Sequence, residues 1–388
     1  MIEAGKAQRQ ETFTYGMVGG GPGAFIGAVH RAALNLGGRA KLVCGCFSRD
    51  PEKSRESGAQ LSLDPARVYD DYEAMAQAEA QRPDRPDFVV VATPNDSHYA
   101  IARAFLEQGI CVMCEKPLTI YVEHAYLLEM AAARHDCLLG VSYVYTGHIM
   151  AKAARRLIRE GAIGEIRMVV AEYPQQWLID AVERENKQAA WRTDPERSGM
   201  SNCVGDIGSH IESLVHYMTG LQIEKLCANL DCFGEGRTLD TNASILLKYV
   251  GGASGLYWCS QVAAGYENAL RVRIFGTEGT IEFEQEKSNF LTYIPKGQPA
   301  RVLVRGGDYL PADIRALDRL PAGHPEGYHE ALANIYDEFL RAIAAKRAGE
   351  EVSADDFDFP HAEMGIDGVW FIEKCAESAK SDEKWIKF

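Results

Sequence analysis

Apolar residues recur along the first part of the chain in short runs that alternate with amphipathic stretches. One run ends in a glycine cluster at Gly19–Gly23, a helix is expected over 28–34, and a second run covers 41–47. Strand, helix and strand within about 35 residues form the unit that a parallel sheet requires. The same pattern continues in further apolar runs at 87–92, 110–114 and 137–143.

The rest of the chain has a different pattern. Its strand-like segments follow one another closely with short glycine turns between them, which predicts a mostly antiparallel sheet. These segments are 165–172, 223–232, 241–249, 253–263, 270–276 and 279–283, and helices are expected at 149–161, 211–218, 330–346 and 363–379. We therefore predict two domains: an α/β Rossmann domain with a parallel sheet over 1–147, and an α+β domain with a large, mostly antiparallel open sheet over 148–388.

The glycine cluster fits the G-x-G-x-x-A form of a dinucleotide-binding loop at Gly19, Gly21 and Ala24. The first glycine permits a tight turn, the second lets the backbone approach a pyrophosphate, and the small third residue lets the helix pack against the sheet. A merely flexible turn is the alternative, but the strand-helix-strand context favours cofactor binding. The other loop residues expected to contact the cofactor are Pro22, Gly23 and Phe25.

The end of the second strand bears on the choice of cofactor. An acidic residue there would hold the ribose 2′-hydroxyl of NAD, whereas an arginine accommodates the 2′-phosphate of NADP. This strand ends on Ser48 and Arg49, and the acidic Asp50 comes only afterwards. The cofactor is thus predicted to be NAD or NADP, with a lean toward NADP. Alternatively, Arg49 is simply a solvated residue at the start of a helix.

Polar residues follow the next two apolar strands. Ligands of open α/β sheets bind beyond the carboxyl ends of the strands, so these residues are expected beside the cofactor. They are Thr93, Pro94, Asn95 and His98 after the third strand, and Glu115 and Lys116 after the fourth. The alternatives are a turn in which Asn95 caps the following helix and a lysine that is only a surface charge.

Composition narrows the function. A net charge of −14 argues against nucleic acid and anionic membranes as partners. No apolar run approaches the roughly 18 residues that span a bilayer. Residues 1–11 lack the apolar core of a signal peptide, so a cytoplasmic protein is expected. Cys111 and Cys114 have C-x-x-C spacing, but no second pair completes a zinc site, so buried free thiols and no metal are expected.

Four motifs in this order resemble those of the Gfo/Idh/MocA family: the glycine loop, Thr93-Pro-Asn-x-x-His98, Glu115-Lys-Pro117 and Gly205-Asp-Ile-Gly-Ser-His210. The resemblance extends from about Phe13 to the end of the chain. It implies an NAD(P)-dependent oxidoreductase of sugars, inositols or related polyols. It also implies a loop, 177–194, over the active site. Separately, one face of the C-terminal sheet is expected to cover helices of its own domain and the other to pair with a second copy, which predicts a homo-oligomer (dimer or tetramer). The substrate contacts expected outside the catalytic residues are Tyr145, Trp191 and Arg192, with Arg197 a weaker candidate.

Asp206 and His210 open the helix expected over 211–218, and they share one face if the helix begins by Asp206. Removing hydride from a secondary alcohol needs a base for the hydroxyl proton, which suits His210. Lys116 would stabilise the developing alkoxide, and Asp206 would orient the imidazole, the lysine or a second substrate hydroxyl. The resemblance implies the same roles, and all three residues are expected to contact substrate. A capping aspartate and a core histidine form the alternative.

The predicted activity is hydride transfer between nicotinamide and a secondary hydroxyl or ketone. Two alternatives use the same scaffold. One is an enzyme that employs tightly bound NAD for net hydrolysis or epimerisation, and the other is a non-catalytic cofactor-binding sensor. The presence of Lys116, Asp206 and His210 together favours an enzyme, because a sensor would need only the glycine loop.

Overall fold

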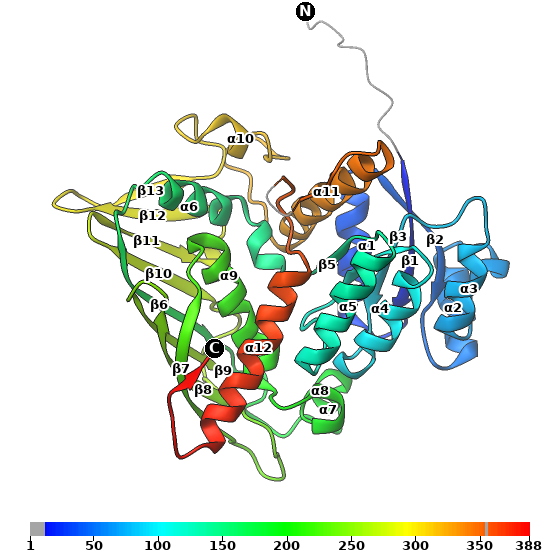
Figure 1. Ribbon diagram of the computed structural model, residues 1–388, viewed down its shortest axis with the longest axis horizontal. Coiled ribbons are helices and arrows are strands. Elements are labelled where there is room, and N and C mark those ends of the chain that lie inside the picture. Colours follow the sequence, from blue (N-terminus) through cyan, green and yellow to red (C-terminus); the bar gives the residue numbers. More distant parts are fainter. Residues whose placement is uncertain (1–11, 354–355) are drawn as a thin grey trace, which may run out of the picture.

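The computed structural model describes residues 12–353 and 356–388. The prediction that no signal peptide occupies residues 1–11 lies outside the described residues. Two sheets form the molecule, with helices packed between and around them (Figure 1).

The first sheet has five strands in the order β2-β1-β3-β4-β5, and every neighbouring pair is parallel. From β1 the chain crosses to β2 on one side and then to β3 on the other, so the connections diverge at the carboxyl edge. Such a reversal opens a crevice for ligands. The predicted parallel Rossmann-type sheet is confirmed. Its strands are β1 (Phe13–Gly19), β2 (Ala40–Cys46), β3 (Phe88–Ala92), β4 (Cys111–Cys114) and β5 (Leu139–Val141).

Every residue of β3 and of β4 is buried, because helices cover both faces of this sheet. Side-chain caps fix the starts of two of these helices. Asp50 accepts the backbone N–H of Glu52, and Asp71 accepts that of Ala74. The helices are α1 (Phe25–Leu36), α2 (Pro51–Gln60), α3 (Tyr72–Ala80), α4 (His98–Leu106) and α5 (Val122–Arg134).

The second sheet has nine strands in the order β13-β12-β11-β10-β6-β9-β8-β7-β14. All neighbours are antiparallel except β6 and β9, which confirms the large, mostly antiparallel sheet. The strands predicted from the sequence are β6 (Ile166–Pro174), β7 (Ile223–Asp231), β8 (Asn242–Tyr249), β9 (Ser254–Ser260), β10 (Arg271–Gly276) and β11 (Gly279–Glu284).

Burial alternates along the central strands of this sheet, as β8 shows residue by residue. The buried side chains face three helices: α6 (Ile149–Arg159), α9 (Ser209–Thr219) and α12 (Ala362–Lys380) (Figure 1). The opposite face carries exposed apolar side chains, among them Met168, Leu246 and Leu256. The sheet is therefore covered on one side and open on the other.

Several short elements are absent from the sequence prediction. They are β12 (Phe290–Pro295), β13 (Arg301–Val304), β14 (Ile386–Lys387), α7 (Lys187–Arg192), α8 (Pro195–Ser198) and α10 (Ala312–Arg315). α7 and α8 lie within and just after the loop expected to lack regular structure. Asn186 and Asp194 cap them, and these caps are the local signals that reveal the two helices.

The last third of the chain returns to the first sheet. The helix α11 (Tyr328–Arg347) packs against α1, and Val141 of β5 donates a backbone hydrogen bond to Pro360. The boundary predicted at 147/148 separates the two sheets, but segments from the last third of the chain pack against the first one. The division into two domains at this boundary stays a prediction.

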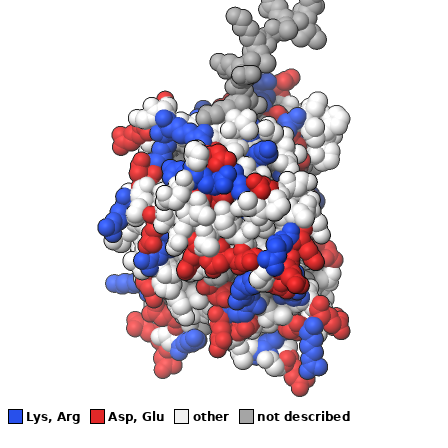
Figure 2. Space-filling view, turned by 90° about the vertical axis from the view of Figure 1, so that its right-hand side faces the viewer, with Lys and Arg blue, Asp and Glu red and all other residues white. Residues whose placement is uncertain are grey.

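Charged side chains of both signs are spread over the end of the molecule that Figure 2 shows, with acidic ones gathering in its lower half. This distribution agrees with the net charge of −14. None of the helices in 12–353 and 356–388 is long and apolar enough to cross a membrane.

Candidate active site

The glycine loop joins β1 to α1 at the carboxyl edge of the first sheet. Gly19 has a φ of +84°, and a Cβ atom there would lie 2.4 Å from the carbonyl oxygen of Ala92. A Cβ atom on Gly21 would lie 2.6 Å from the carbonyl oxygen of Phe47. No described side chain caps α1, so its first N–H groups can receive an anion. The other predicted loop contacts are half-buried or exposed: Pro22, Gly23, Ala24 and Phe25.

At the end of β2, Ser48 is half-buried and Arg49 is exposed. Asp50 Oδ1 accepts the backbone N–H groups of Glu52 at 3.0 Å and Lys53 at 3.4 Å. The only carboxylate near this strand end among Ser48–Asp50 is thus used as a helix cap. Ser48 and Arg49 are left as the residues that can meet the adenosine ribose.

The loop after β3 is bonded to α8 and to the segment after β4. Asn95 Nδ2 donates to the carbonyl oxygen of Ser198 at 3.4 Å, and no described side chain caps α4. His98 is fully buried, and its two ring nitrogens lie 2.8 Å from the carbonyl oxygens of Thr93 and Pro117. His98 therefore ties this loop to the segment after β4 instead of facing open space. Thr93 and Pro94 are half-buried.

Both carboxylate oxygens of Glu115 accept hydrogen bonds from other residues of the chain. Its Oε1 accepts hydrogen bonds from His30 at 2.9 Å and Ser142 at 2.5 Å, and its Oε2 accepts the N–H of Lys116 at 3.1 Å. Burial alone would raise the pKa of Glu115, but the bond from His30 and the charges of His30 and Lys116 lower that pKa to about 2. The other ring nitrogen of His30 lies 2.6 Å from the hydroxyl of Tyr336 in α11. Glu115 thus anchors the backbone beside Lys116.

Lys116 and Asp206 meet, although they are 90 positions apart. Lys116 Nζ donates to Asp206 Oδ1 at 2.9 Å and to its carbonyl oxygen at 2.8 Å. Arg192 Nε donates to the same Oδ1 at 3.1 Å, and Gln261 Nε2 donates to Oδ2 at 3.0 Å. Burial alone would raise the pKa of Asp206, but the charges of Arg192 and Lys116 outweigh it and hold that pKa well below its ordinary value. Asp206 is thus an ionised carboxylate that is paired with two cations, Lys116 and Arg192.

His210 lies beside this carboxylate and is 5% exposed. Its ring packs edge-on against Tyr145 at 4.7 Å and Tyr143 at 5.8 Å, between centroids. Its Nδ1 is buried and has no hydrogen-bond partner among the described residues. Burial, with the charge of Lys116 added, lowers the pKa of His210 to about 3. The imidazole is therefore neutral at physiological pH, and one of its ring nitrogens is a hydrogen-bond acceptor.

The backbone that carries Asp206 differs from the prediction. Val204–Gly208 forms a turn of π-helix, and α9 begins only at Ser209. Gly208 stands at the N-cap position of α9, and the Asp206 carboxylate accepts from side chains alone. The alternative that Asp206 caps the helix is therefore wrong. The π-turn runs directly into α9, so Asp206 and His210 lie four positions apart on one continuous helical segment, and the expected sharing of one face stays a prediction.

Tyr145 belongs to a closed ring of hydrogen bonds. Asn268 Nδ2 lies 3.2 Å from the Tyr145 hydroxyl, which lies 2.5 Å from that of Tyr173, which donates to Asn268 Oδ1 at 2.6 Å. Because the amide nitrogen can only donate, the ring fixes Tyr145 as donor to Tyr173. Its proton is thus committed, and the ring of Tyr145 lies against that of His210.

Trp191 and Arg192 end α7 and stack on each other, with the guanidinium 4.3 Å from the centre of the indole. Trp191 Nε1 donates to Gln188 Oε1 at 3.1 Å. Trp191 packs the loop down, and through Arg192 the same loop contacts Asp206. Arg197 is half-buried in α8.

Comparisons with known proteins agree with this architecture. A family model described as an oxidoreductase family with an NAD-binding Rossmann fold matches residues 13–143, and the model of the GFO/IDH/MocA C-terminal domain matches residues 151–282. The chain belongs to the Gfo/Idh/MocA family. It is 36% identical over 382 residues to the uncharacterized oxidoreductase YfiI of Bacillus subtilis, with 96% of each chain covered.

Solved structures of similar proteins extend the comparison. An inositol dehydrogenase homolog from Azotobacter vinelandii, complexed with NAD+, has a TM-score of 0.95 at 38% identity and covers 97% of this chain and 98% of its own. A structure from the same organism, complexed with NADH and myo-inositol, has a TM-score of 0.92 at 37% identity, with 97% and 98% covered.

The residues of this Gfo/Idh/MocA protein fit a dinucleotide. Gly19 and Gly21 let the loop backbone lie directly against Ala92 at the end of β3 and Phe47 after β2, because a Cβ atom at either glycine would clash there. The uncapped start of α1 supplies the N–H groups that a pyrophosphate needs. Within the described parts of the chain, no group of three or more His, Cys, Asp or Glu side chains is placed to hold a metal ion. Cys111 and Cys114 are buried free thiols, as predicted.

Several residues of this Gfo/Idh/MocA site were missed from the sequence. Gln261 follows β9, Asn268 precedes the next strand, β10, and His30 lies inside α1. Nothing in their local sequence distinguishes them from ordinary polar residues. Only the Glu115-Lys-Pro motif hints that a partner for Glu115 is needed.

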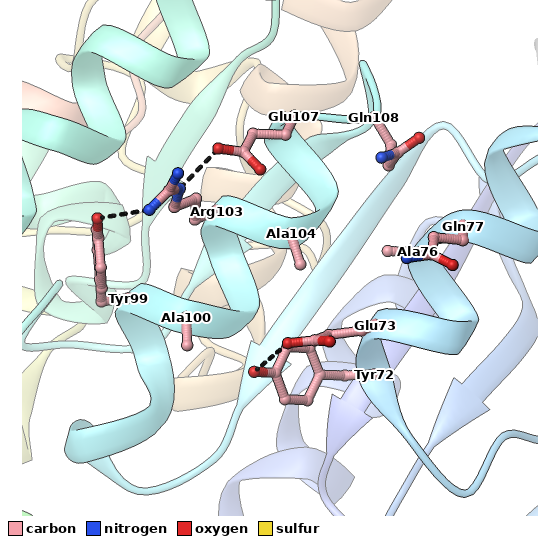
Figure 3. A pocket seen from close by; sticks show the side chains of 10 residues that line it. All are labelled: Tyr72, Glu73, Ala76, Gln77, Tyr99, Ala100, Arg103, Ala104, Glu107 and Gln108. Atoms are coloured by element: carbon pink, nitrogen blue, oxygen red, sulfur yellow. Dashed lines mark hydrogen bonds and ion pairs between the residues drawn. The ribbon is translucent and has the colours of Figure 1, made fainter.

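A groove lies elsewhere, between α3 and α4 on the outside of the first domain (Figure 3). It has a volume of about 360 Å³, and Arg103 on its wall donates hydrogen bonds to Glu107 and Tyr99. No predicted site residue lines it.

Proposed function

We propose that this protein is an NAD(P)-dependent oxidoreductase that transfers a hydride between nicotinamide and a secondary hydroxyl or ketone of a sugar, inositol or sugar derivative. The observation that carries the proposal is the meeting of Lys116 with Asp206, with His210 close by, at the same carboxyl edge of the first sheet from which the glycine loop extends. The 2.9 Å contact of Lys116 with Asp206 joins the cofactor-binding half to the second half. The Azotobacter relative, solved with NADH and myo-inositol, supports a polyol as substrate.

Each of the three residues has a distinct task in this reaction. When bound, the nicotinamide takes up or supplies the hydride. His210, neutral because burial lowers its pKa, accepts the proton of the reacting hydroxyl during oxidation and returns it during reduction. Lys116 donates a hydrogen bond to the oxygen on which negative charge develops. Asp206 orients the ammonium, and the remaining lone pair of its Oδ2 can accept a second substrate hydroxyl.

The loop that carries Trp191 and Arg192 supplies the substrate contacts in this proposal. Arg192 already touches Asp206, so its guanidinium lies where the oxygens of a polyol would gather. Tyr145 forms part of the wall through its ring, because its hydroxyl proton is committed to Tyr173. Gly19, Gly21, Thr93 and Asn95 are proposed to contact the cofactor, whereas Glu115 and His98 position the loops that do so.

For the nucleotide we propose a site that accepts NADP at least as well as NAD. Asp50 uses its Oδ1 for the cap of α2, so only its Oδ2, which lies 3.6 Å from Lys53 Nζ, remains for the ribose 2′-hydroxyl. Arg49 is exposed at the same strand end and can pair with a 2′-phosphate.

We also propose a homo-oligomer, a dimer or tetramer, formed through the open face of the second sheet. Leu246 on that face is 48% exposed and Leu256 is 36% exposed, on adjacent strands. A second copy would remove this apolar surface from water.

A panel of inositols, aldoses and sugar acids, incubated with NAD+ and with NADP+, tests the activity. We expect reduced nicotinamide to accumulate with at least one member. His210→Ala and Lys116→Ala should each lower kcat by about a hundredfold or more while leaving cofactor affinity unchanged.

The other outcomes are distinct. Substrate consumption without net reduced nicotinamide would indicate chemistry with a tightly bound cofactor. Cofactor binding without turnover on any member would indicate a sensor, and either result overturns the proposed activity.

A further inference from the structure

Gln261 lies directly behind Asp206 and belongs to none of the motifs identified from the sequence. It follows β9 and is fully buried. Its Nε2 donates to Asp206 Oδ2 at 3.0 Å, and its Oε1 accepts from Asn202 Nδ2 at 2.7 Å. The two oxygens of Asp206 therefore have different surroundings, because Oδ1 faces the cations and Oδ2 faces this amide.

The direction of every hydrogen bond in this chain is fixed. Asn202 Nδ2 also donates to the backbone carbonyl oxygen of Asp240, at 3.1 Å. Because a carbonyl only accepts, the amide of Asn202 must place its nitrogen on that side. Gln261 must then present its oxygen to Asn202 and its nitrogen to Asp206. We call Asn202 and Gln261 the amide relay. In it, Asn202 donates to the backbone carbonyl of Asp240 and to Gln261, and Gln261 donates to the Asp206 carboxylate.

Asp240 anchors the same relay at its far end. Its buried carboxylate accepts from Ser201 Oγ at 3.0 Å and from the backbone N–H groups of Asn202 and Val204, each at 2.9 Å. These residues lead into the π-turn that carries Asp206. The position of the Asp206 backbone and the orientation of its carboxylate are therefore set by one connected network.

We propose that Gln261 is a positioning residue for hydride transfer, which acts through the amide relay to hold the Asp206 carboxylate ionised and turned toward Lys116. This inference rests on the proposed function. A glutamine suits the task because its amide can donate to a carboxylate and cannot take a proton from it. Lys116 then always meets a full negative charge at Oδ1.

Two substitutions separate positioning from general structural support. Gln261→Leu keeps the bulk and removes the donor, so kcat should fall about tenfold at every pH, since a hydrogen bond to a charged group is lost. Gln261→Glu places two carboxyl groups within hydrogen-bond distance, and such a pair shares one proton with a raised apparent pKa. When that proton is present, the introduced carboxylic acid can again donate to Asp206. When the proton is lost, the added negative charge repels Asp206.

The pH profiles of kcat should therefore differ in shape. Gln261→Glu should be nearly as active as wild type at the acid end and lose activity as pH rises, whereas Gln261→Leu should follow the wild-type profile at a lower level. Asn334→Leu serves as control, because it removes another buried amide that donates only to Gly147, and its profile should match wild type. The cofactor Kd should be the same in all four proteins.

Equal profiles for wild type and both Gln261 variants would overturn the inference, and so would an equal loss in both variants at every pH. If wild type binds cofactor but turns over no member of the panel, the proposed function fails on its own. Crystal structures of wild type and Gln261→Leu then test whether the amide relay orients the Asp206 carboxylate. A rotated Asp206 carboxylate in Gln261→Leu supports it, and an unmoved one contradicts it.

Discussion

The proposed chemistry requires a neutral His210 and an ionised Asp206, although the two side chains are neighbours in the same site. His210 is surrounded by aromatic rings and faces the charge of Lys116, and both effects disfavour the imidazolium. Asp206 is half-buried and is paired with Lys116 and Arg192, which favour the carboxylate. Opposite environments thus give each group the protonation state that its proposed task requires.

The neutral state of His210 has a measurable cost. Its pKa is about 3 in the folded protein, against an ordinary value near 6.5 in the unfolded chain. As pH falls below about 6.5 the unfolded chain binds a proton that the folded protein cannot, so stability is lost. Glutamine does not titrate. Between about pH 6.5 and pH 4, the free energy of unfolding of His210→Gln should therefore fall by roughly 3 kcal/mol less than that of wild type. Denaturant unfolding of both proteins across this range measures the difference, and parallel curves would show that His210 titrates normally.

A second prediction at this scale concerns Arg49. Arg49→Ala should weaken NADP+ binding by about tenfold or more, because one charge-assisted contact to the 2′-phosphate is lost, and should leave NAD+ binding unchanged. Lys53→Ala is the matched control, since it removes an exposed cation from the same region. Fluorescence titration of both nucleotides measures this, and equal effects on NAD+ and NADP+ would refute a role in selectivity.

At the scale of elements, the strands and long helices were predictable because their patterns are local. β3 is an uninterrupted apolar run, and α2 begins at a capping aspartate followed by proline. The π-turn at Val204–Gly208 was not predictable in the same way. It is set by the carboxylate of Asp240, which lies 36 positions away from Val204. Local propensity carries no information about such a contact.

The glycine loop makes an element-scale prediction. Gly21→Ala places a Cβ atom 2.6 Å from the carbonyl oxygen of Phe47, so the loop must shift away from the ligand. We expect the Kd for NAD(H) to rise about tenfold or more, with about 1–3 kcal/mol of stability lost to overpacking. In Gly37→Ala, at the other end of α1, the nearest contact is an ordinary 3.5 Å. That variant should bind as wild type does, and equal binding by Gly21→Ala would contradict the assignment of the loop.

At the scale of the whole molecule, the site exists because two separately patterned halves meet. The sequence pointed to Lys116, Asp206 and His210 through their motifs, and the structure brings all three together. The residues that orient them could not be found in this way. Gln261 is 55 positions from Asp206 and Tyr336 is 306 from His30, so only the assembled fold identifies these partners.

The open face of the second sheet leads to the prediction for assembly. Wild type should elute as a dimer or tetramer in light-scattering chromatography. Leu256→Glu should shift it toward monomer, because a charge would be buried at the interface. Val250→Glu, in the exposed turn after β8, should leave the mass unchanged. A monomeric wild type would remove the proposed interface.

The most direct test of the central claim is a single turnover with the best polyol of the panel, deuterated at its carbinol carbons and followed by nicotinamide absorbance. The account predicts that reduced nicotinamide appears in one phase, which deuterium slows and which His210→Ala nearly abolishes, and that the label is recovered in the nicotinamide. Consumption of the polyol with no label in the cofactor would contradict hydride transfer at this site.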